Sequence, residues 1–226
     1  MVFGKIIRAE TRRDVGLLSL AMTNFDRFLV RMATTRLELQ VLGAACLIIA
    51  SKIREVVPLT IEELVYFADG AFNATDLIEC EVRVLSVLQW DVCAVTSHNF
   101  IDVVSLDLSC SDELIRHSTI LAIQCSNDWK FSNWLPSRVA LTSIFYALDC
   151  FEDVSNINNI KKSLSQLFDL PLATAIALQA QFDEIFLAKS ANTDTSDPVK
   201  YERMLSSDDD SLPSTPTDIR EIIVDK

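Results

Sequence analysis

The sequence has few of the residues that bend or break a chain. Its 226 residues include only four glycines and six prolines. An all-β fold needs many tight turns, and such turns depend on glycine and proline. Half of the residues are hydrophobic, so the chain can bury a sizeable core. We therefore expect an all-α protein with one large domain or two small ones.

Motifs that carry catalysis or bind metals are also missing. The chain has no GxSxG, no Gly-rich phosphate loop and no HExxH. Its two histidines, His98 and His117, have no ligand companion at HxxxH or CxxC spacing. The six cysteines form no CxxC pair, which favours a reducing compartment over a disulfide framework. The sequence thus predicts no enzyme, no cofactor and no metal site.

The charge and the apolar runs limit the partners. The formal net charge is −12, so phosphate backbones are repelled and direct nucleic-acid binding is disfavoured. Solubility alone explains this charge, and a basic protein surface is the alternative partner. The longest apolar stretch, residues 41–50, falls well short of the roughly 20 residues that cross a bilayer. No signal peptide is visible, and we expect a soluble intracellular protein without a membrane contact.

The strongest structural pattern is a helix that is apolar all round. The stretch LQVLGAACLIIASK, residues 39–52, has no polar face for three turns, so other helices must surround it. Thr35 and Glu38 before it match a capping box. An amphipathic helix begins earlier, at Asp14. Its predicted polar face carries Asn24, Asp26 and Arg27.

Further helices continue the pattern in two series. Thr60 with Glu63 forms a second capping box, and Asn73 can cap a helix over residues 76–88. The apolar set predicted for this last helix is Leu77, Ile78, Val82, Val84, Leu85 and Leu88. A second series begins at Thr96 or Ser97, and it has its own nearly all-apolar helix behind Pro136.

The composition divides the chain into four expected parts. Residues 1–13 are irregular, 14–98 form a first helical bundle and 99–189 form a second. Each bundle surrounds its own central helix. Residues 190–226 are rich in Ser, Thr, Asp and Pro, and from residue 191 on they carry nine acidic against four basic side chains. Such a segment buries too little apolar surface to fold, so we expect a disordered acidic tail.

Lys52 and Glu81 stand out among the charged residues. Lys52 ends the apolar helix, and Glu81 lies in mid-helix between Cys80 and Val82. One interpretation is two surface charges that pair with each other. The other is a pair of charges that caps the backbone of a partner, among apolar contact residues. These contact residues would be Ile49, Ile53, Trp90 and Val92.

Three segments carry a resemblance to a known family. They read NFDRFL, LQVLGAACLIIASKIREVVPLTIEEL and LIECEVRVLSVLQWDV, and they resemble the cyclin box, most closely that of D-type cyclins. The likeness is close over residues 15–100 and weaker over 116–144, which is similar to the second cyclin fold. It returns in STPTDIREI near the C-terminus. The resemblance implies two cyclin folds in tandem.

The resemblance also implies a function. D-type cyclins are activating subunits of cyclin-dependent kinases of the four/six type, which phosphorylate retinoblastoma-type proteins at the G1/S transition. The family's kinase-contacting lysine and glutamate match Lys52 and Glu81. The chain would thus be a non-catalytic regulatory subunit, present in nucleus and cytoplasm. Kinase inhibitors and a retinoblastoma-type substrate are further expected partners.

The N-terminus departs from the family pattern. The family's first box helix, with its Met-Arg-x-x-Leu docking patch, has no match before Asp14, and the LxCxE segment is missing. Leu39 and Gln40 match the rest of that patch. The resemblance therefore implies a chain whose first bundle lacks its first helix, as either an N-terminally truncated isoform or an incomplete gene model. Apolar faces of the neighbouring helices would then be uncovered. One alternative function is a truncated isoform that binds the kinase without activating it, or sequesters its inhibitors. Another is a DNA-binding scaffold, which the acidic charge disfavours.

The predicted tail contains one candidate modification site. Thr215 before Pro216 matches the family's phosphorylated threonine, which promotes nuclear export and degradation. The alternative is a chance Thr-Pro pair in a disordered segment. Ser206 and Ser207 each precede an aspartate by three residues, a pattern of acidophilic kinases that is common in acidic tails.

Overall fold

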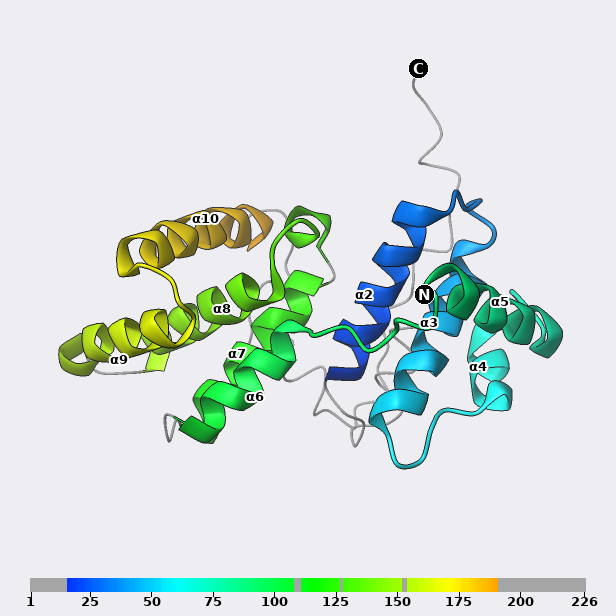
Figure 1. Ribbon diagram of the computed structural model, residues 1–226, viewed down its shortest axis with the longest axis horizontal. Helices are drawn as coiled ribbons and strands as arrows, with labels where there is room; N and C mark the ends of the chain where they lie inside the picture. Colours follow the sequence, from blue (N-terminus) through cyan, green and yellow to red (C-terminus); the bar gives the residue numbers. More distant parts are fainter. Residues whose placement is uncertain (1–15, 108–110, 127, 152–153, 191–226) are drawn as a thin grey trace, which may run out of the picture.

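The structure is a computed structural model that describes residues 16–107, 111–126, 128–151 and 154–190. Every regular element in these ranges is a helix, which confirms the all-α prediction (Figure 1). Three expectations lie outside the described residues: the irregular N-terminus, the missing first helix and the acidic tail.

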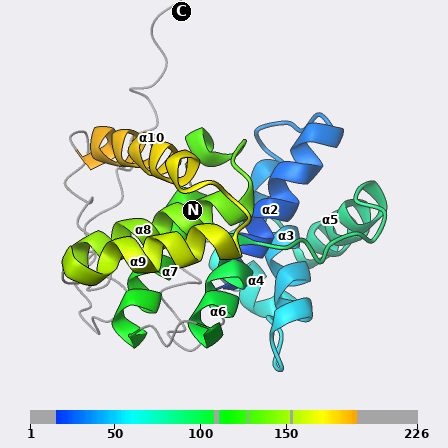
Figure 2. The same ribbon diagram turned by 60° about the vertical axis from the view of Figure 1, so that its left-hand side comes forward.

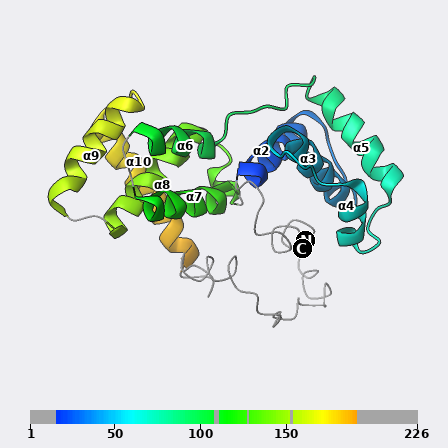
Figure 3. The same ribbon diagram turned by 90° about the horizontal axis from the view of Figure 1, so that it is seen from below.

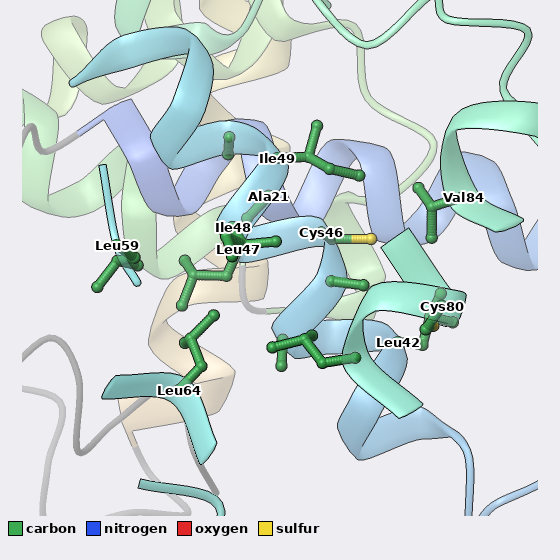
Figure 4. Close-up of a cluster of buried hydrophobic side chains, with 14 of the residues drawn as sticks. Ala21, Leu42, Cys46, Leu47, Ile48, Ile49, Leu59, Leu64, Cys80 and Val84 are labelled. Atoms are coloured by element: carbon green, nitrogen blue, oxygen red, sulfur yellow. The ribbon is translucent and has the colours of Figure 1, made fainter. Parts of the chain in front are cut away.

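The first series of helices surrounds one apolar helix. It comprises α2 (Gly16–Arg31), α3 (Leu39–Arg54), α4 (Ile61–Ala68) and α5 (Ala74–Val87). Both α2 and α5 pack against α3. All ten residues from 42 to 51 are buried, as the missing polar face predicts (Figure 4). The uncovered face that we expected from a lost helix is therefore not found on this part of α3.

The second series repeats this plan around α8 (Pro136–Phe151). Pro136 is the first residue of α8, where its fixed φ and missing N–H cost nothing. The helix contacts four others, and α9 and α10 lie against it in Figure 2. The remaining elements are α6 (Ser97–Asp107), α7 (Asp112–Ser126), the 3-10 helix η1 (Trp129–Phe131), α9 (Val154–Leu167) and α10 (Leu172–Ser190).

The buried side chains form two hydrophobic clusters, one within each series. A single extended connection, residues 88–96, leads from α5 to α6 (Figure 3). Helix α2 contacts both α6 and α7 and so joins the two series. Two cores agree with two bundles, although the predicted boundaries at residues 14, 98 and 189 stay predictions.

Two of the three helix caps predicted in the first series are present in the structure. Thr60 with Glu63 and Asn73 with Asp76 both form complete capping boxes. The prediction at Thr35 was wrong, because α3 begins only at Leu39. There the Glu38 carboxylate accepts bonds from the Thr35 N–H and hydroxyl, at 3.1 and 2.8 Å, so the hydroxyl caps no helical N–H.

Glu38 also ties the start of α3 to α5. Its second carboxylate oxygen accepts a 2.9 Å hydrogen bond from Arg83. The bonds from Thr35 and Arg83 favour the charged form and lower the pKa of Glu38 from 4.5 to about 2. A carboxylate with a lowered pKa stabilises the fold above its unfolded pKa, and this contribution disappears as the pH falls through the folded pKa.

We predict that Glu38→Gln makes the unfolding free energy less dependent on pH between about 4.5 and 2. Urea unfolding at a series of pH values measures this dependence. Glu79→Gln is the matched control, since it removes an exposed carboxylate from the neighbouring α5. The same pH dependence in Glu38→Gln and the control would contradict the assigned contacts.

An ion pair between a buried lysine and an exposed aspartate holds α8, α9 and α10 together. Lys161 Nζ donates to both carboxylate oxygens of Asp149, at 2.7 and 2.8 Å, and to Gln179 Oε1 at 3.0 Å. The Lys161 side chain is 11% exposed, against 43% for Asp149. The Lys161 ammonium therefore needs Asp149 and Gln179 to replace its lost hydration. The Asp149 carboxylate can be hydrated by solvent if Lys161 is removed.

We predict that Asp149→Ala destabilises the protein more than Lys161→Met. Removing the carboxylate leaves a buried ammonium without its counter-charge, at a cost of about 3 kcal/mol. Removing the lysine leaves a hydrated aspartate, and methionine refills the apolar stem, so we expect less than about 1 kcal/mol. Urea unfolding of both variants measures the difference, and equal losses would contradict this asymmetry.

Candidate functional site

The Lys52 and Glu81 side chains meet at the surface between α3 and α5. Lys52 Nζ lies 2.5 Å from Glu81 Oε1, so the two charges pair as one of the two interpretations predicted. The Lys52 side chain is 48% exposed and that of Glu81 is 14% exposed. Because the Lys52 ammonium is half-exposed to solvent, we expect this ion pair to contribute only about 0–1 kcal/mol to stability. An ammonium has three donors, so Lys52 can keep Glu81 and still bind a partner's carbonyl.

Exposed apolar side chains surround this pair. Ile53 follows Lys52 directly and is 40% exposed, and Ile78 and Val82 flank Glu81 on α5 with 46% and 59% exposed. Ile78 and Val82 both belong to the apolar set predicted for this helix, yet they are exposed. Leu77, Cys80, Val84 and Leu88 form the buried face of α5. The apolar residues of this helix cover two adjacent stripes, and periodicity alone does not decide which stripe is buried.

Ile49 and Val92 lie in the core rather than at the surface. They are 3% and 7% exposed, and Ile49 packs within the first hydrophobic cluster (Figure 4). A direct contact with a partner requires exposed area, so the structure corrects their expected role. Both side chains belong to the first hydrophobic cluster.

Trp90 is held outward by the backbone after α5. Gln89 and Trp90 both have left-handed conformations, with φ of 54° and 61°. The Trp90 N–H donates to Leu85 O at 2.9 Å and the Gln89 N–H to Ser86 O at 3.2 Å, the pattern of a Schellman motif. For residues other than glycine, this conformation costs roughly 1–2 kcal/mol each. The Trp90 side chain that it presents is 74% exposed.

Two polar side chains of α2 fasten this loop. Asn24 is fully buried, and its amide donates to Val92 O at 3.1 Å. Arg27 donates to Asp91 O at 2.7 Å and forms an ion pair with the Asp91 carboxylate. The prediction that Asn24 lies on a polar outer face was wrong, because the loop folds over α2 and its buried carbonyl needs a donor. In the sequence, Asn24 stands among other polar residues, so nothing there indicated its burial.

The other expected functional residues lie elsewhere. Leu39 and Gln40 occupy the first turn of α3, about 20 Å along the helix from Lys52 at 1.5 Å per residue. Gln40 is exposed and Leu39 is half-buried. The two residues that match part of the family's docking patch therefore lie far from Lys52 and Glu81. Thr215 lies outside the described residues.

Two other kinds of site are absent from the described residues. No helix there is long and apolar enough to cross a bilayer. In the same residues, no three His, Cys, Asp or Glu side chains are grouped closely enough to hold a metal ion together.

The chain is similar to proteins of one known family. The cyclin N-terminal domain matches residues 9–93. G1/S-specific cyclin-D2 of Xenopus laevis is 30% identical over 222 residues, and human G1/S-specific cyclin-D3 is 32% identical over 221. Each alignment covers 94% of this chain and 76% of the relative.

The fold is also similar to a solved structure. A viral cyclin from herpesvirus saimiri matches with a TM-score of 0.69 and 22% identity, covering 79% of both chains. That likeness shows the fold, and the identity to the D-type relatives over nearly the whole chain shows the family. Members of this family are non-catalytic regulatory subunits of kinases. The chain, a distant relative of the D-type cyclins, belongs to the cyclin family.

Proposed function

We propose that this cyclin activates a cyclin-dependent kinase of the four/six type and so promotes G1/S progression through retinoblastoma-protein phosphorylation. The observation that carries the proposal is the ion pair between the half-exposed Lys52 and Glu81, next to exposed apolar side chains. We call the pair and these side chains the α3–α5 surface; its apolar members are Ile53, Ile78, Val82 and Trp90. The similarity to G1/S-specific cyclins D2 and D3 supports the choice of kinase.

The α3–α5 surface suits the end of a partner helix. The last turn and the first turn of any helix leave backbone carbonyls and N–H groups without intrahelical partners. Lys52 can donate to such carbonyls, and Glu81 can accept from such N–H groups. Burial of the apolar members would supply most of the binding energy, at about 25 cal/mol per Å². The two charges would fix the register of the partner helix.

Activation then requires no chemistry on the cyclin. A rigid surface that contacts the kinase's regulatory helix in its active position binds the active conformer more tightly than the inactive one. The equilibrium shifts by the difference between these two affinities. Because neighbouring helices enclose α3, the end of this helix is held in place and can bind the active kinase conformer preferentially.

Two further parts of the proposal concern regulation. Kinase inhibitors and retinoblastoma-type proteins are proposed as additional partners, with the cyclin acting in nucleus and cytoplasm. Phosphorylation of Thr215 is proposed to promote nuclear export and degradation. A phosphate would add up to two negative charges and three acceptors, which a receptor's arginines can bind.

The decisive experiment combines the full chain with a kinase of the four/six type, ATP and a retinoblastoma fragment. We expect the cyclin to bind the kinase and to raise phosphate transfer to the fragment well above that of the kinase alone. Binding without phosphate transfer would overturn the activator proposal in favour of the non-activating truncated isoform. Absence of binding would overturn the activator proposal and the kinase-binding form of the truncated isoform.

We predict that Lys52→Glu abolishes kinase binding. The substitution places two carboxylates side by side on the α3–α5 surface and removes the ammonium that binds the partner. We expect the Kd to rise beyond the range in which binding is detected. Isothermal titration calorimetry measures the Kd, and circular dichroism confirms that the variant is folded. Lys162→Glu, an equal charge change at an exposed position of α9, should leave the Kd unchanged. Equal effects of the two variants would refute the proposed site.

A further inference from the structure

A groove lies where the two series of helices meet. Its volume is about 520 Å³, and its walls are α2 on one side and the end of α7, η1 and the start of α8 on the other. In Figure 1, α2 stands between this region and the helices α3 and α5 that form the α3–α5 surface. The groove is therefore separate from the Lys52–Glu81 pair.

One wall of the groove is polar and the other is aromatic. Helix α2 contributes Ser19, Met22, Thr23 and Asp26, spaced so that they share one face. The opposite wall includes Phe131 and Trp134, whose rings are 5.4 Å apart, and the 81% exposed Trp129. Phe131 is nearly buried, so the aromatic wall is fixed by the second core.

Asp26 is a charged group of this groove for which the described part of the chain provides no partner. Neither a hydrogen bond nor an ion pair joins it to another described side chain, whereas the adjacent Arg27 is held by Asp91. Its side chain reaches solvent, but the protein around it displaces part of its hydration, and this desolvation raises the pKa of Asp26. A cation placed here would restore the lost solvation.

The rest of the groove adds to this negative character. Asp128 provides a second carboxylate, one oxygen of which accepts the Lys130 N–H. Arg27 is the positive residue in the lining, and its ion pair with Asp91 neutralises it. The indole faces of Trp129 and Trp134 also attract cations. Charge and aromatic lining thus favour a basic occupant, while nucleic acid would be repelled.

We propose that this groove binds a short linear segment of a partner protein, with an arginine on Asp26 and a neighbouring apolar side chain against Phe131 and Trp134. A guanidinium can pair with a carboxylate through two N–H groups and at the same time stack on an indole ring, which an ammonium does less well. The volume holds a few side chains rather than a folded domain. The site requires neither Lys52 nor Glu81.

The test uses fluorescently labelled short peptides in matched pairs. Each pair has arginine or glutamine at the centre, and the flanking positions vary among leucine, phenylalanine and alanine. Fluorescence anisotropy with the full chain, without kinase, gives each Kd. We expect at least one arginine peptide with an apolar neighbour to bind about tenfold more tightly than its glutamine counterpart. Absence of such a preference in every pair would overturn the proposal.

Variants then assign the binding to the groove. Asp26→Asn should weaken the best arginine peptide about tenfold, and Trp129→Ala about threefold. Glu184→Gln, which removes an exposed carboxylate on α10, should leave the Kd unchanged. Equal losses in Asp26→Asn and Glu184→Gln would reduce the effect to overall charge and overturn the assignment. If Asp26→Asn fails to fold, the exposed Trp129 carries the same test, and an unchanged Kd in Trp129→Ala overturns it.

Discussion

A helix with no polar face has to be enclosed on every side, and most of this protein follows from that requirement at α3. Its residues 42–51 are all buried, so α2 and α5 must pack against it. Lys52 is the first residue after this buried run, and its side chain is exposed to solvent. The buried Ser51 hydroxyl accepts the Leu59 N–H at 2.7 Å and donates to Glu55, which turns the chain back toward α4. The end of α3 is thus rigid, as a docking surface needs.

Helix α2 links the parts of the molecule that carry the proposals. One of its faces packs on α3, and its contacts with α6 and α7 join the second series. Asn24 and Arg27 fasten the loop that presents Trp90, while Asp26 lies in the groove between the two series. Neighbouring residues of one helix therefore support two separate surfaces. Neither surface involves catalysis, in keeping with a family of regulatory subunits.

This chain differs from the solved viral cyclin more in its side chains than in its fold. The viral cyclin of herpesvirus saimiri shares the fold at only 22% identity. What such sequences must keep is one enclosed helix per bundle and the apolar faces around it, because core packing tolerates exchange among hydrophobic residues of similar volume. Surface residues have no such constraint from the fold, so core packing does not account for a charge pair such as Lys52 and Glu81.

Local sequence determined the elements whose causes are local. The two central apolar helices, Pro136 at the first turn of α8 and the capping boxes at Thr60 and Asn73 follow from residues within one or two turns of each other. The choice of Lys52 and Glu81 came from their position in the pattern and from the resemblance to cyclins. Tertiary structure alone decided which stripe of α5 is buried and that Ile49 and Val92 are core residues. It also decided that Asn24 bonds a carbonyl 68 positions away and that Asp26 faces a groove. These outcomes depend on contacts between distant segments, and hydrophobic periodicity, which records only that a face is apolar or polar, does not encode what packs against it.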